Sequence, residues 1–205
     1  MNQIIHAAVR RDLARHEQAL RAFPDGDADR AAALRRAWTV LWRQLHHHHE
    51  LEDAHVWPYL RGLDVLDPVV VDELEAEHVA MAEACTAATE AIDALADAPT
   101  AARAHQAADA VAQAARVTEH HLVHEEATIT PVISARTQTP EWKAVEAEFR
   151  KGSPFRAGEL FAWVQDGADA EVGGALRAMM PAPVVLLLSR GFGWSYHRTV
   201  APVWR

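Results

Sequence analysis

A signature built from metal-binding side chains occurs twice in this chain and constrains its fold more than any other feature. In each copy a His is followed four residues later by a Glu, and a Pro follows six residues after that Glu. A lone His precedes each copy, by 42 residues in the first and 43 in the second. Such self-similarity predicts two copies of one helix pair. Corresponding positions lie 72 or 73 residues apart, and they are His6 and His78, His48 and His121, Glu52 and Glu125, and Pro58 and Pro131.

The spacing between each His and its Glu has a physical reason. At 3.6 residues per turn, His48 and Glu52 project from one helix face, one turn apart, and the same holds for His121 and Glu125. An imidazole and a carboxylate so placed can hold one ion, or the carboxylate can bridge two ions. This donor set suits iron, manganese or zinc, because it offers no thiolate to favour softer metals.

The composition predicts an all-α fold. Half of the 205 residues are apolar, and the chain is rich in residues that favour helix. Turn-forming and capping residues divide the first part into four helices joined by short loops, which predicts an up-down-up-down four-helix bundle with one of the four repeated His residues on each helix. The expected helices cover residues 2–22, 27–60, 67–98 and 100–134.

Charge divides the chain near Thr139 and Pro140. Residues 1–139 carry 12 Lys/Arg and 22 Asp/Glu, whereas residues 140–205 carry 8 and 7. We therefore expect a bundle over residues 1–135 and a C-terminal helical extension over residues 136–205. The extension either packs on the bundle or serves for docking. Its aromatic and basic end, within residues 182–205, is a candidate surface for a homodimer or a protein partner.

Several classes of protein are disfavoured. A net charge of −9 argues against general nucleic-acid binding. The longest apolar run, residues 182–188, is too short to span a membrane. The single cysteine, Cys85, allows no intrachain disulfide, and the first residues do not resemble a signal peptide. We therefore expect a cytoplasmic protein without a membrane partner.

The paired motif and its upstream His residues resemble the hemerythrin-like HHE cation-binding family over roughly residues 1–135, and the extension resembles those of actinobacterial members. The resemblance implies a four-helix bundle holding two iron ions with an oxo or hydroxo bridge, with iron favoured over manganese or zinc. It implies oxygen binding or a role in oxidative stress, with peroxide, nitric oxide or oxygen as the small ligand. It also implies terminal ligands and bridging carboxylates, which are His6, His48, His78 and His121, and Glu52 and Glu125.

The motif departs from the oxygen-carrying hemerythrins, which use five His and two carboxylates. The residue four after His78 is Ala82, so the third helix offers one His only. Six ligands and a shared bridge would fill about ten of about twelve octahedral positions on two irons. About two open positions would favour redox chemistry over simple oxygen storage, and an extra ligand would weaken that argument.

Several neighbours of the motif are candidate supplementary ligands or outer groups. Asp53 and Glu126 follow the two motif Glu residues and could accept hydrogen bonds from ligand His residues. His16 is expected at the surface, and the alternative is that it replaces His6 as the ligand from the first helix. The remaining candidates are His49, Glu50, Tyr59 and His124.

Three hypotheses follow. The first is a di-iron protein that consumes peroxide or nitric oxide. The second is a non-enzymatic sensor or store of oxygen, nitric oxide or iron, and the third is a bundle in which the metal is only structural. We expect no catalytic residue beyond the metal ligands.

Overall fold

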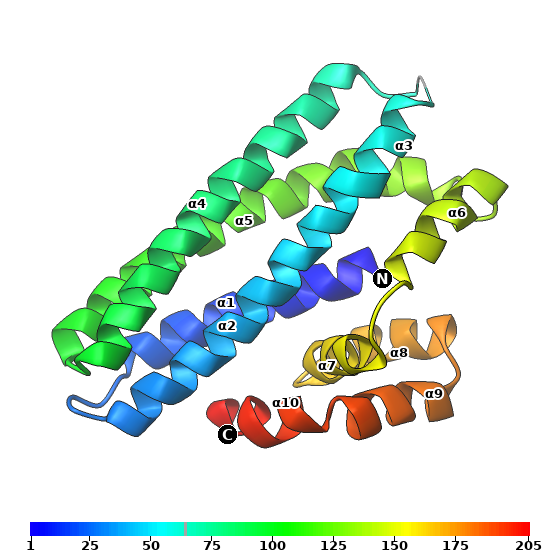
Figure 1. Cartoon of the computed structure of the whole chain (residues 1–205). Helices are drawn as coiled ribbons and strands as arrows, with labels where there is room; N and C mark the ends of the chain where they lie inside the picture. Colours follow the sequence, from blue (N-terminus) through cyan, green and yellow to red (C-terminus); the bar gives the residue numbers. More distant parts are fainter. Residues whose placement is uncertain (64) are drawn as a thin grey trace.

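The computed structural model describes residues 1–63 and 65–205, and within these it contains helices and no strand (Figure 1). Four long helices run antiparallel and form the bundle: α1 (Asn2–Arg21), α2 (Ala28–Leu51), α4 (Pro68–Asp97) and α5 (Ala101–Ser134). The all-α prediction is confirmed. Among the described residues, no single helix is long and apolar enough to cross a membrane. The bent pair Ala170–Met179 and Ala182–Phe192, with 112° between its halves, has the length and composition of a broken span.

The predicted helix starts carry side-chain caps. The side chain of Asp27 accepts from the backbone N–H of Arg30, and that of Asp67 accepts from the N–H of Val69. Both caps satisfy N–H groups that have no partner inside the helix. Thr100 caps α5 in the same way.

The second expected helix is not α-helical throughout. After α2 the chain continues as a π-helical turn, η1 (Glu52–Val56), and then as α3 (Trp57–Arg61). The backbone N–H of Trp57 bonds to the carbonyl of Glu52, five residues back. Pro58 explains the wider turn, because its ring lacks an N–H and crowds the carbonyl four residues before it.

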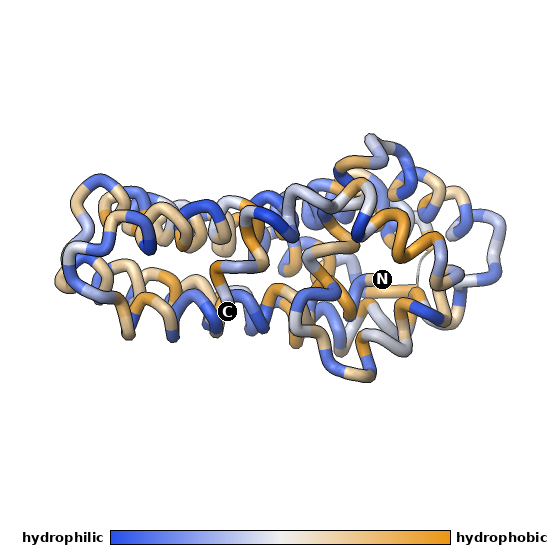
Figure 2. The backbone as a smooth tube through the Cα atoms, turned by 90° about the horizontal axis from the view of Figure 1, so that it is seen from below, coloured by the Kyte–Doolittle hydropathy of each residue, from blue (hydrophilic) through white to orange (hydrophobic). Residues whose placement is uncertain are grey.

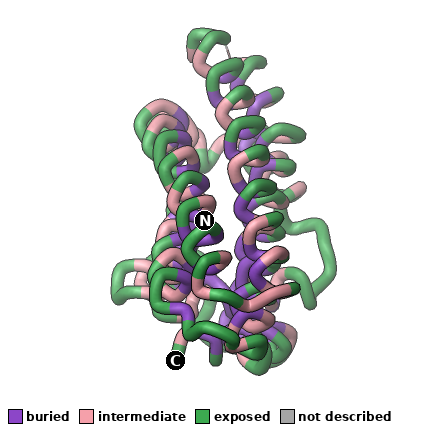
Figure 3. Tube along the Cα trace, turned by 90° about the vertical axis from the view of Figure 1, so that its left-hand side faces the viewer, coloured by how far each residue is buried: buried purple, intermediate pink, exposed green. Residues whose placement is uncertain are grey.

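The bundle holds two apolar clusters rather than one continuous core. The larger runs through most of the bundle and includes Leu45 on α2, Cys85 on α4 and Leu122 on α5. The smaller fills the end near α3 and includes Val56, Trp57, Leu74, Ile129 and Trp142. Figure 2 shows apolar and polar residues alternating along the helices, and Figure 3 shows buried residues on the faces that the helices turn toward each other.

The extension follows α5 as short helices. It comprises α6 (Pro140–Phe149), α7 (Pro154–Gln165), α8 (Ala170–Met179), α9 (Ala182–Leu186), the π-helical η2 (Leu187–Phe192), α10 (Trp194–Thr199) and the 3-10 turn η3 (Ala201–Trp204). The α6 helix lies beside the amino terminus (Figure 1). Residues of α7 and α10 belong to the larger apolar cluster, so the extension shares the core of the bundle.

Polar contacts also hold the extension against α1 and α2. The indole N–H of Trp163 donates to the buried carboxylate of Asp12 at 2.8 Å, and Arg30 donates to the carbonyl of Val203 at 2.7 Å. His16, which the sequence placed at the surface, is fully buried, because Trp204 of η3 covers it at 4.8 Å between ring centroids. That expectation was wrong because it took no account of the extension.

Candidate metal centre

The six motif residues meet in one buried polar layer across the bundle. Along α2 and α5 the chain passes from residues of the larger cluster, through this layer, to residues of the smaller cluster. Along α4 it passes from the smaller cluster to the larger one. None of the six is more than 10 % exposed at its side chain. They come from four helices and from the first residue of η1: His6, His48, Glu52, His78, His121 and Glu125.

Their donor atoms form two adjacent groups that could each hold an ion. His6, His48 and Glu125 form one group, and the other contains His49, Glu52, His78 and His121, with all chosen donor atoms of a group within 4.8 Å of one another. We call these the three-donor and four-donor groups. The Nε2 atoms of His6 and His48 are 3.2 Å apart, and so are those of His78 and His121.

Both carboxylates lie against both groups. Glu52 places Oε1 3.3 Å from His48 Nε2 and Oε2 3.7 Å from His78 Nε2. Glu125 places Oε2 3.2 Å from His6 Nε2 and 3.8 Å from His121 Nε2. Each carboxylate is therefore positioned between the two groups, as a bridging ligand would need to be.

His49 is a seventh donor at this layer. Its side chain is buried, and its ring stacks on that of His78 with centroids 4.1 Å apart. The sequence named His49 only as a supplementary candidate, because adjacent helical residues point about 100° apart and His48 has the better motif spacing. The imidazoles of His48 and His49 nevertheless both reach the layer, one in each donor group.

Carboxylates outside the layer fix the orientation of three of the imidazoles. Nδ1 of His78 lies 2.7 Å from Asp53 Oδ1, and Nδ1 of His6 lies 2.8 Å from Glu126 Oε1. Nδ1 of His121 lies 3.0 Å from Glu77 Oε2. Carboxylates only accept, so in each case Nδ1–H donates and the lone pair of Nε2 points into the layer.

Sequence reasoning named Asp53 and Glu126 as such acceptors but missed Glu77. No local motif marks Glu77, since its partner His121 is 44 residues away on another helix. It also missed Asn2, whose side-chain N–H donates to Glu125 Oε1 at 2.7 Å. The only local hint of Asn2 is its position four residues before His6, one turn away on α1.

The other supplementary candidates lie outside the two groups. Glu50 is 58 % exposed and pairs with His46 and His47. Tyr59 packs against Trp142 at 5.4 Å between ring centroids. The ring of His124 donates from Nδ1 to Glu77 Oε1 at 2.8 Å, on the outer side of α5.

Burial favours the neutral form of the His48 and His121 imidazoles. Desolvation, together with the neighbouring His6, lowers the pKa of His48 to about 3. Desolvation and His78 lower the pKa of His121 to about 3. Burial and the nearby Glu125 raise the pKa of Glu52 well above its ordinary value, whereas the closely placed His6 imidazole lowers that of Glu125 despite its burial. Neutral imidazole is the form that binds metal ions.

The layer contains buried polar atoms without hydrogen-bond partners within the described chain. They are Nε2 of His49, Oε2 of Glu52 and Oε2 of Glu125. Buried polar atoms almost always have a hydrogen-bond partner or a metal ion. Three such atoms without a partner in one layer therefore indicate that an additional partner binds there. A pair of divalent ions fits this requirement, because all three atoms are potential ligand atoms and the donors are nitrogen and oxygen.

Comparison with known proteins agrees with this arrangement. Residues 5–133 match the family model described as the hemerythrin HHE cation binding domain, which covers more than half of the chain. Neither the curated proteins nor the solved structures contain a significant match.

Proposed function

This chain belongs to the hemerythrin HHE cation-binding domain family, and on that premise we propose that its buried layer holds two iron ions and binds or reacts with a small oxidant or gas. The three-donor and four-donor groups would each hold one ion. Glu52 and Glu125 would bridge them, because each carboxylate reaches both groups.

One observation carries the proposal. Nδ1 of His78 and Nδ1 of His121 both donate to carboxylates, so neither Nε2 carries a hydrogen in the neutral imidazole. The two Nε2 lone pairs nevertheless face each other across 3.2 Å. A cation between them removes the repulsion and satisfies both, and a water molecule could satisfy them only by donating both of its hydrogens at that one position.

The seventh donor changes the expected number of open positions. With His49 included, five imidazoles, two bridging carboxylates and one shared bridge fill about eleven of about twelve octahedral positions. About one position would stay open, instead of the two expected from six ligands. One open position supports binding of a single small ligand. It therefore supports the non-enzymatic sensor or store as a second candidate beside the redox enzyme.

The protein's own residues would control what happens at that position. When bound, the iron pair supplies an open coordination position and one-electron redox chemistry. Asp53, Glu77 and Glu126 hold three of the imidazoles in one tautomer and orientation. The apolar clusters on either side limit the access of water and of larger molecules, which supports peroxide, nitric oxide or oxygen as the ligand.

A solely structural role for the metal has less support. The larger apolar cluster extends through most of the bundle and into the extension, so most of the apolar burial does not involve the polar layer. By contrast, classical structural metal sites supply the folding energy of domains that lack such a core.

Metal content and the absorption spectrum of tag-free, aerobically purified protein test the proposal. We expect two irons per chain, charge-transfer absorption, and a spectral change on adding azide, nitric oxide or peroxide. Gas evolution with repeated peroxide turnover would identify the redox enzyme, and a stable adduct without turnover would identify the binder. Zinc at both positions, or no bound metal, would refute the di-iron proposal.

A further inference from the structure

The segment from α9 to α10, residues 182–199, has a buried side and an exposed apolar side. On the buried side, Val185 and Tyr196 belong to the larger apolar cluster. On the exposed side, the large apolar side chains are 42–61 % exposed. They are Val184, Leu186, Leu187 and Trp194, and we call this surface the extension face. Phe155 of α7 lies beside it, since it is 59 % exposed and its ring centroid is 5.4 Å from that of Phe192.

The extension face carries positive charge. Residues 172–205 contain four Arg and no Asp or Glu, in a chain whose net charge is −9. Arg190 and Arg198 are exposed within the same segment as the apolar side chains. Glu159 of α7 and Asp166 after it already pair with Arg residues of α2 and α1. The extension face therefore combines large apolar side chains with uncompensated cations.

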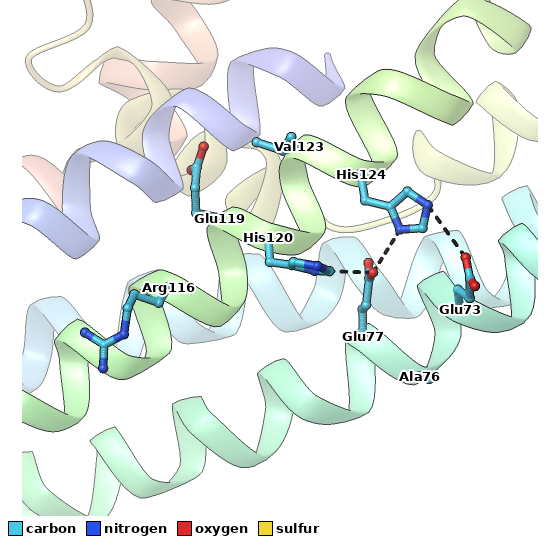
Figure 4. A pocket seen from close by; sticks show the side chains of 8 residues that line it. All are labelled: Glu73, Ala76, Glu77, Arg116, Glu119, His120, Val123 and His124. Atoms are coloured by element: carbon cyan, nitrogen blue, oxygen red, sulfur yellow. Dashed lines mark hydrogen bonds and ion pairs between the residues drawn. The ribbon is translucent and has the colours of Figure 1, made fainter.

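The far side of the bundle has the reverse charge. The helices α1 and α2 lie between α4 and the extension (Figure 1). The hollow between α4 and α5 is lined by three carboxylates and one Arg (Figure 4). Packed helix axes are about 8–10 Å apart, so these carboxylates lie beyond the roughly 8 Å Debye length from anything that touches the extension face. An anionic surface is therefore attracted to the extension face with little opposition from the acidic side.

This chemistry fits a lipid bilayer with anionic headgroups. Apolar side chains on such a face enter the boundary between headgroups and acyl chains, while Arg side chains bind lipid phosphates. Trp194 suits that boundary, because its ring is apolar and carries one polar N–H. A symmetric contact between two copies of the chain would instead bring two positive faces together.

The contacts with the bundle determine how the extension can meet a bilayer. The bent pair with the composition of a broken span includes Leu176 and Val185, and both are buried in the larger apolar cluster. Insertion of the pair would break these contacts, whereas docking of the exposed side keeps them. The expectation of no membrane partner rests on the lack of a spanning segment, which does not exclude contact of one face with a membrane surface.

We propose that the extension face docks the protein on the surface of an anionic bilayer. Its apolar side chains would lie at the headgroup boundary, with Arg190 and Arg198 against lipid phosphates. The proposal is independent of which metal the buried layer holds.

Co-sedimentation of the full chain, with its resident metal, tests the proposal. The probes are vesicles of phosphatidylcholine alone and of phosphatidylcholine with phosphatidylglycerol in equal parts. Arg190→Gln combined with Arg198→Gln removes the charge of the face. Leu187→Ser removes an apolar contact, since this side chain is 60 % exposed.

Matched controls make the same changes elsewhere on the molecule. Val79→Ser alters a side chain of α4 that is 61 % exposed. Arg103→Gln combined with Arg116→Gln removes two charges from α5. Circular dichroism and the content of resident metal show that each variant is folded.

We expect the protein to bind the anionic vesicles, to bind less as salt rises, and to leave the phosphatidylcholine vesicles largely unbound. An Arg near an anionic surface contributes about fivefold in affinity, so the double Arg variant should bind at least about tenfold more weakly. Leu187→Ser should also lower the affinity, by about tenfold, and both controls should bind as the unmodified protein does.

The absence of binding to anionic vesicles at low salt would overturn the proposal, and so would an equal loss in the controls. A dimer in lipid-free solution that Leu187→Ser abolishes would assign the extension face to a second copy of the chain and would overturn it as well.

Discussion

Asp53 offers a direct test of how the polar layer is held in place. Its Oδ1 accepts from Nδ1 of His78 at 2.7 Å and from the indole N–H of Trp57 at 2.8 Å. Asp53→Ala removes both bonds while leaving every proposed metal ligand present. The His78 ring then loses the contact that fixes its tautomer and directs Nε2 into the layer, so the ion held by the four-donor group should bind more weakly.

The expected magnitude follows from the exposure of Asp53. Removing an outer hydrogen-bond partner of a ligand His typically costs about 10–100-fold in metal affinity. Asp53 is 51 % exposed at its side chain, so water can replace part of its role and the loss should lie near the lower end. A tenfold loss is about 1.4 kcal/mol. Asp53→Asn keeps an acceptor but loses the charge, and it should therefore cost less than Asp53→Ala.

Competition with a chelator of known affinity measures this loss, with metal counted before and after equilibration. Asp93→Ala, an exposed Asp on the opposite half of α4, is the control for removing a carboxylate. Affinity equal to that of the unmodified protein in the Asp53→Ala variant would refute the orienting role. An equal loss in the Asp93→Ala variant would show that general charge, rather than the bond to His78, is responsible.

Three further predictions concern the site, the extension and pH. Glu52→Ala combined with Glu125→Ala should abolish binding of both ions, and iron stoichiometry that survives would show the bridging assignment to be wrong. Gly158→Ala should destabilise the fold by roughly 3 kcal/mol in chemical unfolding, the upper end for overpacking, because its new Cβ would lie 2.5 Å from the backbone of Phe192; an unchanged midpoint would contradict this packing. Burial lowers the pKa of His16, so the unfolded chain takes up its proton first as pH falls below about 6.5, and stability should drop by up to about 1.4 kcal/mol per pH unit from this group. His16→Phe should reduce that slope in urea unfolding at pH 7.5 and 5.5, and an identical slope would exclude the contribution.

Most of the fold could be predicted because its determinants are local. The caps Asp27, Asp67 and Thr100 lie where the sequence placed helix starts. The six motif residues meet because i, i+4 spacing puts each His and Glu on one face, and a bundle brings those faces together. The π-helical turn escaped prediction, because Pro58 near the end of a helix can stop the helix or widen the turn before it.

The parts that could not be predicted depend on contacts between helices. Glu77 and Asn2 reach residues on other helices, and neither has a partner in its own sequence neighbourhood. His49 stacks on His78 of another helix, and His16 is covered by Trp204 of the extension. Periodicity specifies the face on which a residue lies, but it does not specify which side chain of another helix lies opposite.

The division of the interior into two apolar clusters has a further consequence. Regions with separate cores can open independently, each with its own free energy. The smaller cluster joins α3, α6 and the adjoining ends of α4 and α5, and it meets the rest of the interior across the polar layer. An ion bound in that layer ties the two regions together and stabilises the closed form by mass action. Metal binding would then protect the backbone amides of α3 and α6 from hydrogen exchange, at a distance from the metal itself and without unfolding of the long half of the bundle.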